Sequence, residues 1–317
     1  MHPAFRSLPR RFLYAVKPAS WPKLLVPAAV GQALGALSAG TWSWSGAAIG
    51  AAFTTALLIH VVLLNDWFDV RVDAIKRQMF PDAGAPKTIP DAILHAQTVL
   101  LAGLGAGLCA ASLALCGEIL VERPGLALAG LGCIGLLLAY SAPPLRFNDR
   151  GVGELLEAVG VGALLPWFNA YVQSGELLPA GLILVLPGLV MLALASAIAS
   201  GLADEESDLA GGKSTFTTQF GNAEARRAAE YSLLGGALCW AIVARLAPQV
   251  LHPFSVTAGL GAIAWHMRTV MSTSSRATTN AFAEISRYKA ALHRAVWDGA
   301  LALTATAVLL WILGVGW

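Results

Sequence analysis

The sequence contains few charged residues and few cysteines for its length. Asp, Glu, Lys and Arg make up 13% of the 317 residues, whereas a typical soluble domain has about 25%. Four cysteines are too sparse for a disulfide scaffold, and a net charge of +2 does not indicate a nucleic-acid partner. Intrinsic disorder is excluded as well, because disordered chains are poor in apolar residues and this chain is 56% hydrophobic.

Long apolar runs are what the sequence has in place of charge. A membrane-spanning helix needs about 20 mostly apolar residues, and transmembrane β-strands would instead alternate in polarity over about 10 residues. Nine runs fit the helical pattern: 21–38, 46–64, 97–116, 125–140, 153–172, 178–200, 229–247, 252–271 and 297–315. The sequence therefore predicts an all-α membrane protein with nine transmembrane helices, organised as a single polytopic domain over residues 1–317.

The few charges are unevenly distributed between the two predicted faces. With nine spans, the N-terminus and the loops after even-numbered spans share one side. All 21 lysines and arginines except Arg123 and Arg245 lie there, as do all 19 acids except Glu118, Glu122 and Glu176. Because Lys and Arg concentrate in cytoplasmic loops, this distribution predicts a cytoplasmic N-terminus.

Two acidic clusters lie at span ends on this predicted cytoplasmic face. The first occupies Asn65–Asp73 in the predicted loop 65–96, and the second occupies Asp204–Asp208 in the loop 201–228. At about 100° per residue, a continuous helix would place Asn65, Asp66, Asp69 and Asp73 on one narrow face. The same spacing would bring Asp204 and Asp208 together.

Such clusters predict a bound cation. Carboxylates one helical turn apart repel one another, and they are costly at a membrane boundary. Mg²⁺ prefers carboxylates, water and phosphate oxygens as ligands. With Lys213 nearby, we expect Mg²⁺ to hold a diphosphate between the clusters; the predicted metal ligands are Asp66, Asp69, Asp73, Asp204 and Asp208. The alternative is that each cluster is simply a solvated helix end beside lipid headgroups.

These residues resemble the motifs of the UbiA superfamily of intramembrane prenyltransferases. Its N-x-x-x-D-x-x-x-D motif is matched by Asn65, Asp69 and Asp73, with Asp66 also typical. Its D-x-x-x-D motif and the G-K-x-T continuation are matched by Asp204, Asp208, Gly212, Lys213 and Thr215. An intervening Y-S-x-P-P-x-R segment is matched from Tyr140 to Arg146. The resemblance extends over about residues 15–315.

Two further segments resemble the branch that prenylates 1,4-dihydroxy-2-naphthoate. These are Gly151–Glu154 and Tyr171–Gly175. The chain departs from many relatives in another place: they carry an Arg-Pro pair after the first motif, whereas this sequence has Lys87 within Ala85–Pro90. Lys87 is therefore the candidate for the phosphate-facing cation of that segment.

The resemblance implies Mg²⁺-dependent transfer of a prenyl chain from an allylic prenyl diphosphate to an aromatic or quinol-precursor acceptor, within a central cavity of the bundle. The five aspartates would be catalytic through the metal. The other predicted substrate-binding residues are Asn65, Lys87, Tyr140, Arg146 and Lys213. Tyr140 would face the allylic cation or serve as an ordinary interfacial tyrosine. The sequence identifies no general base.

The expected partners are the prenyl diphosphate donor, the acceptor and membrane lipids, with no nucleic acid. The expected location is a bacterial inner membrane, with the site facing the cytoplasm. A transporter or cation pathway is the alternative from another class, although transporters place such acids near the midplane. A terpene cyclase of the same family would use no acceptor. A CDP-alcohol phosphotransferase is disfavoured because its Gly and Ala-Arg spacing is absent.

Overall fold

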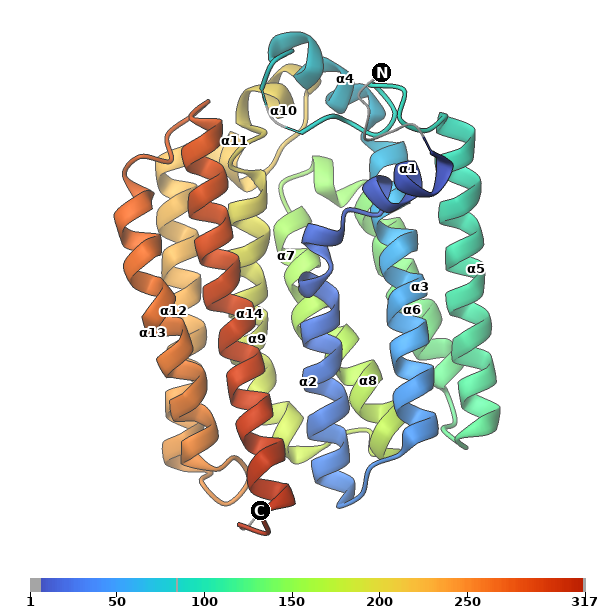
Figure 1. Ribbon diagram of the computed structural model, residues 1–317, viewed down its shortest axis with the longest axis vertical. Helices are drawn as coiled ribbons and strands as arrows, with labels where there is room; N and C mark the ends of the chain where they lie inside the picture. Colours follow the sequence, from blue (N-terminus) through green and yellow to red (C-terminus); the bar gives the residue numbers. More distant parts are fainter. Residues whose placement is uncertain (1–6, 84, 316–317) are drawn as a thin grey trace.

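The computed structural model describes residues 7–83 and 85–315, and within them the regular structure is helical apart from one isolated β-bridge between Arg150 and Ser214. Long helices stand side by side as a bundle, and short helices gather at one end of it, near the N-terminus (Figure 1). We call this end the upper end. Its short helices are α1 (Leu8–Ala15), α4 (Val70–Met79), α10 (Glu205–Gly211) and α11 (Phe216–Phe220).

Helices lie over each of the nine predicted apolar runs. They are α2 (Pro22–Ala39), α3 (Trp44–Phe68), α5 (Ala96–Leu120), α6 (Leu126–Ser141), α7 (Gly153–Val159) with the π-helical turn η4 (Gly160–Leu164) and α8 (Leu165–Ser174), α9 (Ala180–Gly201), α12 (Asn222–Leu246), α13 (Pro253–Ser274) and α14 (Phe282–Ile312). The 3₁₀ turns η2 (Pro18–Ser20) and η3 (Phe147–Asp149) complete the described helices.

Six helical segments of the described chain are long and apolar enough to cross a membrane. They are α3, α5, the α7–α8 segment Gly153–Ser174, α9, α12 and α14. Helix α6 is apolar but has 16 residues. Helices α2 and α13 are not among the six; α2 contains Lys23 and Gln32, and α13 contains His266 and Arg268. The chain is thus an all-helical integral membrane protein.

Local signals fix the hairpin between α2 and α3. Helix α2 ends at Gly40, whose φ of 65° lies in the left-handed region that glycine adopts without strain. Ser43 then caps α3, since its Oγ accepts a hydrogen bond from the Gly46 N–H at 3.0 Å. The two helices are therefore antiparallel neighbours, joined by a short turn at the end opposite the upper end.

Glycines allow α2 to approach α8 closely. A Cβ on Gly31 would lie 2.1 Å from the Pro166 carbonyl oxygen, and one on Gly35 would lie 2.5 Å from that of Ala170. Small residues favour such backbone contacts in membranes. This contact joins the two larger hydrophobic clusters of the bundle: one formed mainly by α9 and α12–α14, the other mainly by α3, α5, α6 and α8. Helix α2 contributes to both clusters and stands between the two groups (Figure 1).

Candidate functional site

The two acidic clusters lie together at the upper end of the bundle. Helix α4 packs against α10, where a Cβ on Gly211 would be 2.9 Å from Val72 Cγ2. Lys76 of α4 crosses this contact: its Nζ donates to the Ala203 carbonyl at 2.7 Å and forms an ion pair with Asp204. The fold therefore brings together two acidic segments that are far apart in the sequence.

The first cluster does not lie on one continuous helix, and that part of the prediction was wrong. Helix α3 ends at Phe68 and α4 begins at Val70, with Asp69 between them at ψ 6°. The Asp69 N–H still donates to the Asn65 carbonyl, and the Asp73 N–H to the Asp69 carbonyl, each at 2.9 Å. One-turn spacing therefore persists, but the carboxylates turn to different partners.

Each carboxylate of the first cluster is bound by a different lysine. Asp66, which is 3% exposed, pairs with Lys17 and accepts a hydrogen bond from Thr88 Oγ1 at 2.5 Å. Asp69 pairs with Lys213 at 3.1 Å.

The third ion pair of this cluster joins Asp73 to Lys87. The lysines come from the α1–α2 connection, the loop after α4 and the loop after α10. Ion pairs therefore join three separate segments to the end of α3 and the start of α4.

The second cluster is less completely neutralised. Asp204 precedes α10 and is bound by Lys76. Asp208, which is 5% exposed, has no ion pair with any described lysine or arginine. Burial raises the pKa of its carboxyl to about 7, and Lys213 offsets only part of that effect.

Other pKa shifts follow from the same balance of burial and charge. Burial raises the pKa of Asp69 despite its bond to Lys213. For Asp204 burial opposes ionisation, but Lys76 and Lys87 outweigh it and lower the pKa. The pKa of Lys87 is raised, because Asp204 and Asp73 outweigh its burial. Lys87 and Asp204 are therefore held charged, while ionised Asp69 and Asp208 would be stabilised by an added cation.

The residues fit a divalent cation in chemistry, with lysines now bound to four of the predicted metal ligands. Within the described residues, no three His, Cys, Asp or Glu side chains are grouped so as to hold a metal ion by themselves. The donors are carboxylate oxygens, the type that Mg²⁺ prefers. The buried Asp208 lies close enough to Asp69 and Asp204 for their charges to raise its pKa further. An added cation would relieve this repulsion, so the role of the five aspartates as ligands stays a prediction.

The remaining predicted polar residues border the same site. Asn65 Nδ2 donates to Asp69 Oδ2 at 3.3 Å. Arg146 pairs with Asp149 at 2.6 Å, and the Ser214 N–H donates to the Asp149 carbonyl at 3.0 Å. The Tyr140–Arg146 segment is thereby tied to the loop that carries Lys213.

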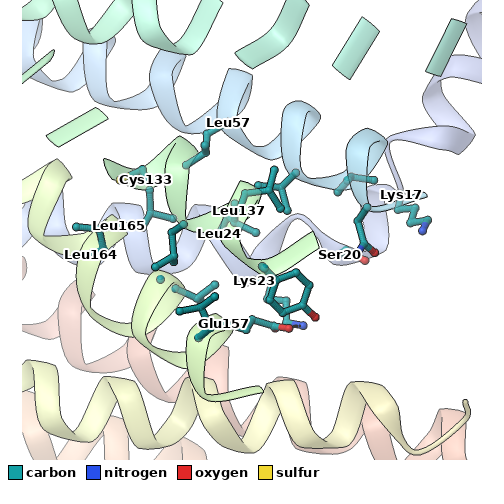
Figure 2. Close-up of a pocket in the computed structure, with 18 residues that line it drawn as sticks. Lys17, Ser20, Lys23, Leu24, Leu57, Cys133, Leu137, Glu157, Leu164 and Leu165 are labelled. Atoms are coloured by element: carbon teal, nitrogen blue, oxygen red, sulfur yellow. Dashed lines mark ion pairs between the residues drawn. The ribbon is translucent and has the colours of Figure 1, made fainter. Parts of the chain in front are cut away.

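A cavity of about 240 Å³ opens beside the clusters, between α2, α3, α6 and the α7–η4–α8 segment. Asn65, Lys17 and Tyr140 line it, so it adjoins both the first cluster and the Tyr140–Arg146 segment. The π-helical turn η4 contributes Gly160, Val161 and Leu164; such turns occur frequently at functional sites. Figure 2 shows polar groups on one side of the cavity, Lys17, Ser20, Lys23 and Glu157, and apolar ones on the other, Leu57, Cys133, Leu164 and Leu165.

Sequence reasoning missed several of these residues. Lys17, Lys76 and Thr88 bind the aspartates from segments outside the motifs. Buried acids predict that some lysines lie nearby, but this does not identify Lys17 and Lys76 as those lysines. Lys23 and Glu157 form an ion pair at the cavity; an acid within the fifth apolar run was the available signal for Glu157.

Comparisons with known proteins agree on one family. Residues 24–293 match the model of the UbiA prenyltransferase family. The chain is similar to the chloroplastic chlorophyll synthase of Arabidopsis thaliana, 28% identical over 269 residues that cover 76% of this chain and 65% of that protein. The corresponding rice protein, from Oryza sativa subsp. japonica, is 29% identical over 218 residues, covering 66% of this chain and 54% of its own length. The chain thus spans less than two thirds of the curated relatives it matches.

Solved structures share the fold. A UbiA homolog from Archaeoglobus fulgidus, bound to GPP and Mg²⁺, matches with a TM-score of 0.68 at 18% identity, over 92% of this chain and 99% of that one. A UbiA homolog from Aeropyrum pernix K1 matches with a TM-score of 0.66 at 11% identity, over 90% and 96%. A structure of digeranylgeranylglyceryl phosphate synthase matches with a TM-score of 0.60 at 12% identity, over 95% and 99%.

Proposed function

Because the chain belongs to the UbiA prenyltransferase family, we propose that it transfers a prenyl chain from an allylic prenyl diphosphate to an acceptor within the membrane and releases diphosphate. One observation carries this proposal. Two carboxylate clusters and four lysines meet at the upper end of the bundle, beside a cavity with an apolar wall. The charged end suits the diphosphate and the apolar wall suits the prenyl chain.

The charged end would bind the leaving diphosphate. The five aspartates would hold Mg²⁺, which neutralises charge on the departing oxygens when bound. Lys213 and Lys87 already sit among these carboxylates, and Arg146 borders them. Their charge-assisted hydrogen bonds would fix the diphosphate oxygens. Asn65 holds Asp69 by the hydrogen bond from its amide.

The cavity would shelter the prenyl chain and the carbon that it transfers. Its leucines exclude water, and exclusion of water strengthens electrostatic interactions at the charged end. Tyr140 lines the cavity, and the face of its ring is suited to stabilise an allylic cation. These two properties favour transfer over transport, since an ion pathway does not need an apolar chamber beside its acidic residues.

The acceptor is proposed as an aromatic or quinol-precursor compound, with 1,4-dihydroxy-2-naphthoate as the first candidate from the motif resemblance. The similarity to chlorophyll synthases adds chlorophyll precursors as a second class. A terpene cyclase reaction would consume the same donor with no acceptor. The similar A. fulgidus structure, bound to GPP and Mg²⁺, supports the choice of donor and metal.

The proposed orientation has nine membrane-spanning helices, a cytoplasmic N-terminus and the upper end in the cytoplasm. Lys and Arg concentrate on that side, as the positive-inside rule requires. A bacterial inner membrane is the proposed location, although the similar chlorophyll synthases are chloroplastic.

The test is to incubate membranes that contain the protein with Mg²⁺, labelled geranyl diphosphate and a panel of aromatic acids, quinol precursors and chlorophyll precursors. We expect diphosphate release and label transfer to one class of acceptor. Label in a cyclic hydrocarbon, with no acceptor consumed, would support the cyclase instead. Intact geranyl diphosphate after incubation with every member of the panel would contradict the proposal.

A further inference from the structure

The cavity contains one carboxylate among its described lining residues, that of Glu157. This residue lies on α7, inside the membrane-spanning segment Gly153–Ser174. In Figure 2 it faces Lys23 at the polar side of the cavity. The five motif aspartates do not line the cavity, so Glu157 is set apart from them in position.

The surroundings of Glu157 argue against a purely structural role. It forms an ion pair with Lys23 of α2, and the two side chains are only 21% and 17% exposed. Lys23 Nζ also donates to Ser200 Oγ of α9 at 3.1 Å. Placing a charge pair inside a membrane bundle costs free energy of desolvation, and a contact between apolar residues would join the helices without that cost. An ionisable residue within a membrane-spanning segment and beside a cavity is a candidate functional residue.

The proposed reaction leaves one chemical task unassigned. An aromatic acceptor that is attacked at a ring carbon must afterwards lose a proton. The five motif aspartates stand at the diphosphate end and do not line the cavity that would hold the acceptor. Lys17 and Lys23, which also line the cavity, each form an ion pair with a carboxylate. The described lining offers no histidine.

We propose that Glu157 is the proton acceptor for the prenylated compound and that Lys23 positions its carboxylate. The assignment rests on the proposed function. In this step the bond between the donor's C1 and its diphosphate oxygen breaks, and both electrons leave with diphosphate. The acceptor carbon supplies the electron pair of the new bond to C1. Its proton then moves to a Glu157 carboxylate oxygen, and the partial exposure of that side chain lets water remove it.

The experiment compares four variants of the full chain in lipid nanodiscs. Glu157→Gln keeps the size of the side chain but removes the basic carboxylate, and Glu157→Asp keeps a displaced carboxylate. Lys23→Met removes the partner and leaves the base. Glu154→Gln is the matched control on the same helix: Glu154 accepts a hydrogen bond from the Phe216 N–H at 2.8 Å, which Gln also accepts, and it does not line the cavity.

Each variant is given Mg²⁺ and geranyl diphosphate, with and without 1,4-dihydroxy-2-naphthoate, and both diphosphate release and prenylated product are measured. We expect Glu157→Gln to lose product formation by about 100-fold or more, as for loss of a general base. Diphosphate release without acceptor should stay near that of the unaltered protein, with geraniol as the co-product. Glu157→Asp and Lys23→Met should lose less product, and Glu154→Gln should match the unaltered protein.

Three outcomes would count against this account. Undiminished product from Glu157→Gln would overturn the role of Glu157 alone. Equal losses of product and diphosphate release in Glu157→Gln and Lys23→Met would assign the ion pair to structure. If the unaltered protein released no diphosphate from geranyl diphosphate, the proposed function itself would fail and the assignment of Glu157 with it.

Discussion

The two acidic clusters differ in how the fold neutralises them. All three aspartates of the first cluster pair with lysines, and these lysines come from three separate segments. In the second cluster Asp204 pairs with Lys76, but Asp208 is buried with a pKa raised to about 7. Every aspartate of the first cluster thus has a lysine partner, although burial still raises the pKa of Asp69, whereas the second cluster retains a buried carboxylate without such a partner among the described residues.

This difference indicates which cluster depends more on ligands. A buried carboxylate without a cation destabilises the folded protein when it ionises. A divalent cation would therefore stabilise ionised Asp208 the most. Asp66, Asp69 and Asp73 would each have to exchange a lysine for the cation. In this arrangement the lysines released from the carboxylates are available to a diphosphate that arrives with the metal.

Removal of divalent metal should have the largest effect. Excess chelator should abolish diphosphate release from geranyl diphosphate, because without the metal the lysines stay paired with the aspartates and do not neutralise the leaving group. Restoring Mg²⁺ should restore the rate in full. The measurement is release of diphosphate by the unaltered protein in membranes; sustained release in excess chelator would contradict the metal role of both clusters.

Substitution of a lysine bound to each cluster should reduce diphosphate release by less than metal removal does, and by different factors for the two clusters. Lys213→Gln should reduce diphosphate release by about 100-fold, because Lys213 faces Asp69 in the site and electrostatic stabilisers of this kind contribute about that much. Lys76→Gln should reduce it by less, since Lys76 joins α4 to the Ala203 carbonyl and Asp204 and is not among the residues proposed to contact the diphosphate. Rates measured side by side at saturating Mg²⁺ test this order, and a greater loss in Lys76→Gln would reverse it.

Stability should reveal the smallest effect, with opposite signs in the two clusters. At pH 8, above the pKa of Asp208, Asp208→Asn should raise the melting temperature, because it removes an ionised carboxylate that burial penalises; a gain of about 1 kcal/mol is expected. Asp69→Asn should lower the melting temperature, because Lys213, 8% exposed, loses its partner. The expected loss in the free energy of unfolding is about 3 kcal/mol. Thermal unfolding of metal-free protein measures both, and shifts of the same sign would remove the distinction between the clusters.

Much of the fold was predictable, because apolarity marks the part of each helix that a membrane would surround. It does not mark helix ends. Helix α14 begins at Phe282, well before the predicted run 297–315, and its first turns carry Glu284 and Arg287. These polar turns form helix outside the apolar window. The interruption at Asp69 was also unpredicted, since neither proline nor glycine stands there.

The candidate site was predictable where motifs carry it. The motif aspartates, Asn65, Lys87 and Lys213 come together as expected. The lysines on Asp66 and Asp204 were not predictable, because they lie 49 and 128 residues from their partners and no local periodicity links residues so far apart. Glu157 shares the fifth apolar run with Glu154, and only its place at the cavity, which requires the fold, distinguishes it from that residue.

A double-mutant comparison of Asp69→Asn and Asp204→Asn most directly tests the claim that the two clusters form one diphosphate site. The readout is Mg²⁺-dependent diphosphate release from geranyl diphosphate by each single variant and by the double variant. If the carboxylates act on one leaving group, each single variant should lose about 1,000-fold and the double variant little more, because residues that act as a unit are not additive. Full activity in either single variant, or losses that multiply in the double variant, would contradict a shared site.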